Sequence, residues 1–113
     1  MNASSVISRA RSILQDDLAP YRFTDAYMLQ RFSDAQFNLA NIRPDLVATT
    51  AFGATTITDV SSVSTASAFD ETMRMPLAYL TAEQVYLTED ADAGNLAQAA
   101  SMRSKFQQAM AGA

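Results

Sequence analysis

Apolar residues recur at helical spacing in four separate stretches of the chain, and each stretch predicts an α-helix. The first extends from about Ser4 or Ser5 to Asp16, and Pro20 prevents the helix from continuing further. Its apolar stripe consists of Val6, Ile7, Ala10, Ile13 and Leu14. The polar residues expected to face solvent are Arg9, Arg11, Ser12 and Gln15.

The second predicted helix begins at Thr24 and ends at Arg43-Pro44. The Thr24 hydroxyl is suited to cap the helix, because it can accept a hydrogen bond from a backbone N–H two or three residues later. Asp25 places a carboxylate at the positive end of the helix dipole. The expected buried stripe is Met28, Leu29, Phe32, Ala35, Leu39 and Ile42. Phe37 lies off this stripe, so we expect it at the edge of the core or against a partner.

Residues 46–67 differ from the rest of the chain in their high content of serine and threonine. Ten of the nineteen residues from Thr49 to Ser67 are of these two types. Together with the turn candidate Gly53, they predict either a β-hairpin arm or a flexible loop. An ordered arm would need a neighbour to pair with, because an isolated hairpin is only marginally stable in water. The candidate contact residues of the arm are Thr55, Thr56, Ile57 and Val60.

Two further helices are predicted toward the C-terminus, joined by the acidic turn Glu89-Asp90-Ala91-Asp92. The third helix starts near Ser67 or Asp70, and Pro76 marks either a second start or a kink. One face carries Met73, Leu77, Leu80 and Leu87, and another carries Met75, Tyr79, Ala82 and Tyr86. The fourth helix covers roughly residues 92–110. Its expected inward positions are Leu96, Ala99 or Ala100, Phe106 and Met110.

The third helix is apolar on more than one side, and such a helix must be covered on more than one face. In a domain of this size we expect another molecule to supply the second covering surface. Tyrosine and methionine are also typical of the centres of interfaces. The residues predicted to form a subunit or partner interface are Phe37, Met75, Tyr79, Tyr86, Met102, Phe106 and Met110.

Composition favours one helical domain spanning residues 1–113, because about half of the residues are apolar and only three are glycine. The predicted fold class is all-α, a small bundle of about four helices with the Ser/Thr-rich loop or hairpin arm between the second and third. Residues 111–113 are expected to form a flexible tail. No apolar run approaches the ~20 residues that span a bilayer, and we expect no signal peptide.

Candidate catalytic chemistry is sparse, because the chain has no histidine and no cysteine. Asp16-Asp17 is the nearest approach to a carboxylate dyad, but neighbouring residues on a helix do not face each other. We therefore expect a structural or solvated role for this pair, and a carboxylate-based hydrolase is disfavoured. Glu89-Asp90-Ala91-Asp92 lacks the ligand spacing of a calcium loop and is interpreted as a solvated capping turn. No catalytic, cofactor or metal site is predicted.

The net charge of −4 is unevenly distributed. Residues 1–43 carry five arginines and four aspartates, whereas residues 44–113 carry three basic and eight acidic side chains. Binding to nucleic-acid phosphates needs clustered lysine and arginine, and Lys105 is the single lysine. We therefore expect no specific binding of DNA; an acidic surface would let nucleic acid pass without sticking.

Two groups of these residues carry a resemblance to a known family. The first group is Arg22-Phe23-Thr24-Asp25, Leu29, Phe32, Asp34-Ala35-Gln36 and Arg43-Pro44-Asp45. The second is Pro76-Leu77-Ala78-Tyr79-Leu80, Tyr86-Leu87, Asp90-Ala91-Asp92 and the closing helix through Phe106. Both resemble the head-to-tail connector proteins of tailed phages, the adaptors that sit beneath the portal. The likeness covers about residues 5–45 and 69–110 and consists of helix caps and packing positions. Segment 46–67 departs from the family, in which this region tends to be longer and more structured.

The resemblance implies a virion structural protein that has no reaction and no cofactor. It implies a homo-oligomeric ring, twelvefold in symmetry, around the DNA channel in the neck between capsid and tail. The partners would be the phage portal protein and a tail or nozzle protein, with DNA passing through unbound and no membrane involved. Synthesis would take place in the bacterial host cytoplasm, and the C-terminal helix and tail would contact the portal.

The alternative is a small soluble regulatory module that binds a partner protein helix in a groove of Met and Tyr side chains. Residues 46–67 distinguish the two, because a ring protein should order this arm on assembly whereas a one-to-one binder has no need of it.

Overall fold

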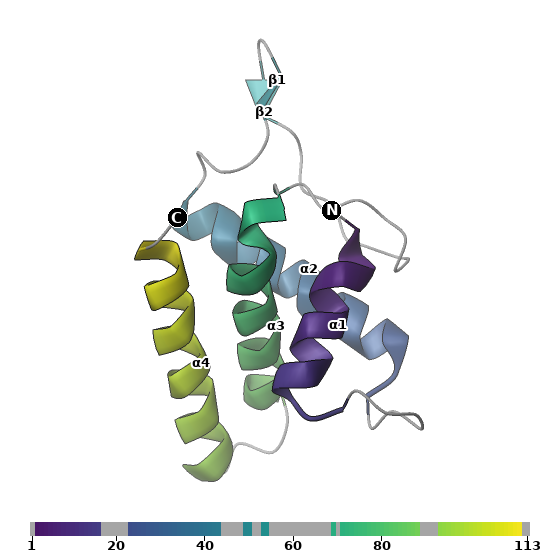
Figure 1. Cartoon of the computed structure of the whole chain (residues 1–113), viewed down its shortest axis with the longest axis vertical. Helices are drawn as coiled ribbons and strands as arrows, with labels where there is room; N and C mark the ends of the chain where they lie inside the picture. The colour runs from purple at the N-terminus through teal and green to yellow at the C-terminus, as the bar shows by residue number, and fades with distance from the viewer. Residues whose placement is uncertain are drawn as a thin grey trace.

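The computed structural model contains the four predicted helices and is all-α (Figure 1). The helices are α1 (Ala3–Ile13), α2 (Asp25–Ile42), α3 (Arg74–Thr88) and α4 (Ala93–Ala111). The structure describes residues 2–16, 23–43, 49–50, 53–54, 69, 71–88 and 93–111. The predicted four-helix architecture is therefore confirmed.

Helix α3 lies at the centre of the fold and packs against α1, α2 and α4 (Figure 1). Its buried residues are Pro76, Leu77, Ala78, Leu80, Thr81, Ala82, Glu83 and Val85. Three helices of the same chain thus cover the several apolar sides of α3. The second covering surface, which the sequence analysis assigned to another molecule, is provided by helices of the same chain. The hydrophobicity of α3 is therefore no evidence of a partner.

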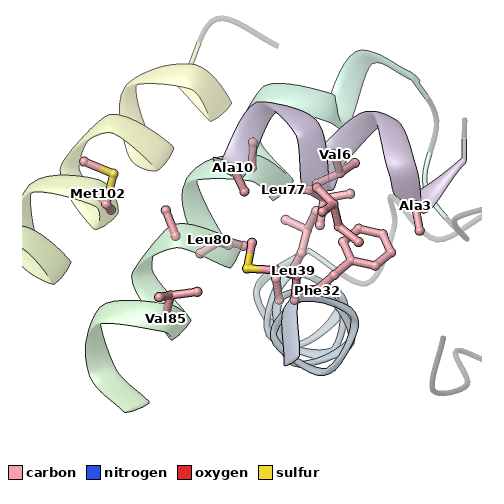
Figure 2. Close-up of a cluster of buried hydrophobic side chains, with 14 of the residues drawn as sticks. Ala3, Val6, Ala10, Phe32, Leu39, Leu77, Leu80, Val85 and Met102 are labelled. Carbon is pink, nitrogen blue, oxygen red and sulfur yellow. The ribbon is translucent and has the colours of Figure 1, made fainter. Parts of the chain in front are cut away.

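The other helices pack unequally. Both α1 and α2 contact α3 and also each other, whereas α4 contacts α3 alone among the described helices. Figure 2 shows the result: Val6 of α1, Phe32 of α2 and Leu77 of α3 gather in one cluster, and Met102 of α4 lies on the far side of α3. Helix α4 is therefore an edge helix, with much of its surface left open.

The predicted start of the second helix is confirmed, whereas α3 begins at Arg74, later than the predicted start near Ser67 or Asp70. The Thr24 Oγ1 accepts a hydrogen bond from the Tyr27 backbone N–H at 3.2 Å, which caps α2. Pro76 lies in the first turn of α3, directly after a 3-10 turn at Glu71–Met73. The first turn of a helix has no i−4 partner for its N–H groups, so proline costs no hydrogen bond there. Pro76 thus marks a helix start and not a kink.

Three residues predicted to face inward are exposed instead. Ile42 is 45% exposed, Leu87 46% and Leu96 51%. Each lies in the first or last turn of its helix. Periodicity gives the direction of a side chain but not how far the neighbouring helix extends, so these predictions were wrong at the ends of the helices. Ala99 and Ala100 were the two alternatives for one inward position of α4; Ala99 is buried and Ala100 is exposed.

Two short strands lie between α2 and α3. Strand β1 (Thr49–Thr50) pairs antiparallel with β2 (Gly53–Ala54), with Thr49 opposite Ala54 and Thr50 opposite Gly53. The arm residues Thr55, Thr56, Ile57 and Val60 lie outside the described residues, as does the acidic turn at 89–92.

Candidate functional site

A buried ion cluster joins the end of α1 to the start of α2. The Arg11 Nη1 donates to Asp16 Oδ2 at 2.8 Å and to the Phe23 carbonyl at 2.9 Å. The Arg11 Nη2 donates to Asp25 Oδ1 at 2.9 Å. The Phe23 backbone N–H donates to Asp16 Oδ2 at 3.1 Å. Thus Arg11 holds two carboxylates and one carbonyl in a single cluster.

This cluster corrects the prediction for Arg11 and decides between the two alternatives predicted for Asp16. Arg11 was expected to face solvent and is only 5% exposed. Asp16 was expected to be either structural or solvated, and it is only 7% exposed. The physical reason is that α1 ends at Ile13, before Asp16, and the chain then turns back. The structural role predicted for Asp16 is confirmed, because its Oδ2 is engaged by Arg11 and by Phe23. Its sequence neighbour Asp17 lies outside the described residues.

The turn that brings Asp16 back is a Schellman motif. The Asp16 N–H donates to the Arg11 carbonyl at 2.8 Å, and the Gln15 N–H donates to the Ser12 carbonyl at 3.2 Å. These two bonds are the 6→1 and 5→2 pair of that motif. Gln15 has a φ of 58°, the left-handed conformation that this position normally gives to glycine.

A second ion pair connects α3 to α4. The Arg103 Nε donates to Glu83 Oε2 at 2.6 Å, and Nη2 donates to Oε1 at 2.7 Å. Glu83 is buried, whereas the Arg103 side chain is about a third exposed. The guanidinium carbon of Arg103 also lies 5.7 Å from the centre of the Phe106 ring. Such a bidentate pair fixes the plane of the guanidinium, so Arg103 presents a positioned cation at the surface of α4.

Next to Arg103 is an open cavity of about 400 Å³, which we call the α2–α4 groove. It is lined by Ile42, Arg43, Arg103, Phe106, Gln107 and Met110. The groove exists because α2 and α4 both pack on α3 but not on each other. Its lining combines apolar side chains with two arginines. That chemistry suits an apolar or aromatic group that carries a neighbouring carboxylate.

The predicted interface residues fall into three groups. Phe37 and Met75 are exposed. Tyr79, Tyr86 and Met110 are half-buried and pack against the core. Met102 and Phe106 are buried in the core of this chain, as was expected of Phe106 in the fourth helix; their assignment to an interface stays a prediction.

Of the predicted interface residues, Phe106 and Met110 come together in the α2–α4 groove. Sequence reasoning missed Arg103 and Gln107. A signal for both was present, because positions 103, 106, 107 and 110 have the i, i+3, i+4, i+7 spacing of one helix face. Ile42 and Arg43 were noticed only as the end of a stripe and the stop of a helix. Their part in the groove depends on how α2 crosses α3, which no local pattern specifies.

In the part of the chain that the structure describes, no three acidic side chains are grouped so that they could hold a metal ion. None of the described helices combines the length and the apolarity needed to cross a bilayer.

Comparison with known proteins gives no match to this chain: no family model, no curated protein and no solved structure is significantly similar.

Proposed function

We propose that this chain is a structural subunit of a tailed-phage neck, a head-to-tail adaptor that forms a ring beneath the portal and continues the DNA channel toward the tail. The observation that carries the proposal is the position of the resemblance residues in the fold. Phe23, Thr24 and Asp25 form the junction of α1 and α2, where Thr24 caps the helix and the other two bind Arg11. Leu29, Phe32 and Ala35 lie in the core.

The proposed role is assembly and not catalysis. The buried carboxylates of Asp16 and Glu83 are each held by an arginine, so both act in this fold as structural charges. The edge helix α4 and the α2–α4 groove beside it offer a surface for contact with other subunits. A ring subunit needs such a surface in addition to its own core.

Charge also supports a conduit for DNA. Residues 44–113 carry five more acidic than basic side chains. Lysine and arginine in a channel wall would retain DNA by neutralising its phosphates, whereas an acidic or neutral wall lets it slide.

The test is affinity purification of the tagged full chain from phage-producing cells of its native source, with the tag alone as the control. We expect a phage portal protein as the main large partner, identified by mass spectrometry, and ring-shaped particles in electron micrographs of the eluate. A single small partner at one-to-one stoichiometry would overturn the adaptor role. It would instead support the regulatory module that binds a partner helix.

A further inference from the structure

We infer that the α2–α4 groove receives the Phe37 side chain of a second copy of this chain, in a head-to-tail contact. The inference rests on the proposed ring and specifies the contact that builds it. A single exposed aromatic residue or a single shallow cavity is common on protein surfaces, so neither half of the contact would support the inference by itself. The inference is supported by the fit between the two halves of the contact.

The first half of the contact is the outer face of α2. Phe37 is 39% exposed and lies two residues before Leu39, which is fully buried against α3. Two positions on a helix differ by about 200°, so Phe37 points away from the core. Asp34 lies one turn earlier on the same face, and its side chain is about half exposed. It pairs at 3.3 Å with Arg31, whose side chain is only 15% exposed, so the exposed side of the Asp34 carboxylate is the part open to a second molecule.

The second half is the groove at the end of α2. Phe106 and Met110 give it an apolar lining, and Ile42 gives it an apolar wall that is exposed to solvent. Arg43 and Arg103 add two guanidinium groups, and that of Arg103 is already paired with the Glu83 carboxylate. The cavity of about 400 Å³ lies near the lower limit of ligand pockets, which run from roughly 300 to 1,000 Å³. It therefore suits one or two side chains better than the face of a whole helix.

The groove and the outer face of α2 carry side chains that suit each other. The chain has only eight basic residues and a net charge of −4, yet two of those basic residues line this groove. The outer face of α2 offers an aromatic ring with a carboxylate one turn away. A guanidinium attracts the face of an aromatic ring over which it lies. A second copy of the chain thus supplies an aromatic ring, with a half-exposed carboxylate one turn away, that suits the apolar and guanidinium lining of the groove.

The symmetry of the contact follows from where its halves lie. Phe37 is on the outer side of α2, and the groove is at the helix end beside α4. Two different surfaces meet, so each molecule keeps one free half after the first contact. Such a heterologous contact builds a ring where the rotation between neighbours closes and an open filament where it does not; the proposed function requires the ring. In a two-fold dimer, by contrast, both copies contribute the same surface, and no half of the contact stays free.

Two single variants test the contact. Phe37→Asp removes the inserted ring, and Ile42→Glu places a charge in the wall of the groove; both positions are exposed, so both variants are expected to fold. Each should raise the Kd of self-association by at least about thirtyfold in sedimentation experiments, the loss typical of a central aromatic anchor. The matched control is Leu96→Asp, since Leu96 is at least as exposed as Ile42 and lies outside the groove. It should associate like the unmodified protein.

Mixing the two variants gives the decisive result. The Phe37→Asp chain retains an intact groove and the Ile42→Glu chain retains an intact Phe37, so an equimolar mixture should form a one-to-one dimer and nothing larger. If both variants are monomeric alone and remain so when mixed, the pairing of Phe37 with the groove is overturned.

Two further outcomes separate this contact from the adaptor role. If the Phe37→Asp variant forms rings as readily as the unmodified chain, the contact is wrong and the ring remains. If the unmodified protein stays monomeric at several hundred micromolar but still captures a portal protein, self-association through this groove is overturned and the adaptor role stands.

Discussion

Arg11 and Asp16 form an ion pair of 2.8 Å that is almost fully buried at the junction of α1 and α2. The same guanidinium also binds Asp25 at 2.9 Å, where the carboxylate is largely exposed. One arginine therefore makes two ion pairs that differ chiefly in their access to water. Burial should decide how much each contributes to stability.

We expect Asp16→Ala to lower the free energy of unfolding by about 2–4 kcal/mol, because it removes the buried partner of Arg11 and the acceptor of the Phe23 N–H, and leaves Arg11 paired with the largely exposed carboxylate of Asp25. Asp25→Ala, the matched control on the same arginine, should cost less than about 1 kcal/mol beyond any loss from the helix dipole. Urea unfolding followed by circular dichroism measures both. Equal losses in the two variants would show that burial is not what distinguishes the pairs.

Gln15 offers a stabilising substitution. A non-glycine residue in the left-handed conformation costs roughly 1–2 kcal/mol, whereas glycine adds about 0.4–1 kcal/mol of entropy to the unfolded chain. Gln15→Gly should therefore raise the free energy of unfolding by about 0.5–1 kcal/mol. Gln15→Val should lower it, because a β-branched side chain fits this conformation poorly. A loss of stability in the glycine variant would mean that the Gln15 side chain makes a contact worth more than the strain.

The ion pair of Glu83 with Arg103 should hold the edge helix α4 against α3. Arg103→Met removes the partner of a buried carboxylate, and we expect a loss of about 2–4 kcal/mol, somewhat below a fully buried pair because Arg103 is partly exposed. The double variant Glu83→Met with Arg103→Met should recover most of this loss, since no buried charge is then left. Hydrogen exchange of the α4 amides gives a local readout. If the double variant is no more stable than Arg103→Met, the loss in Arg103→Met does not come from an unpaired buried carboxylate.

The fold was predictable because the local signals for helix starts and for buried helix faces are clear in this sequence. Thr24 caps α2, Pro76 starts α3, and the stripe around Phe32 and Leu39 is buried as its period requires. Local signals do not specify how much of the length of each helix is covered by its neighbours. Ile42, at the last turn of α2, therefore lies at an open groove and not in the core.

The candidate site was predictable only in part, for a related reason. Phe106 and Met110 were recognised as apolar residues, but the arginines beside them were not, because polar residues on a helix are normally assigned to solvent. Arg11 was misassigned in the same way. Its burial is explained by Asp16 and Phe23, which approach only after the chain has turned at Gln15.

Phe37 and Tyr86 were predicted together as interface residues, and the structure now separates them. The Tyr86 side chain packs against the core, whereas Phe37 points outward. Tyr86→Ala should therefore lower the free energy of unfolding by about 2–4 kcal/mol, the cost of a cavity beneath a large side chain. Phe37→Ala should change it by less than about 0.5 kcal/mol, as is usual for an exposed position.

Thermal unfolding of dilute monomer, measured beside sedimentation at high concentration, tests this separation of stability from assembly. Phe37→Ala should weaken self-association while leaving the unfolding midpoint near that of the unmodified chain. Tyr86→Ala should lower the midpoint, and at temperatures where the variant stays folded its self-association should be unchanged. If Phe37→Ala unfolds the monomer, Phe37 contributes to the core, and the head-to-tail contact loses its central residue. If Tyr86→Ala abolishes assembly without loss of stability, the subunit contact lies on α3 and not in the α2–α4 groove.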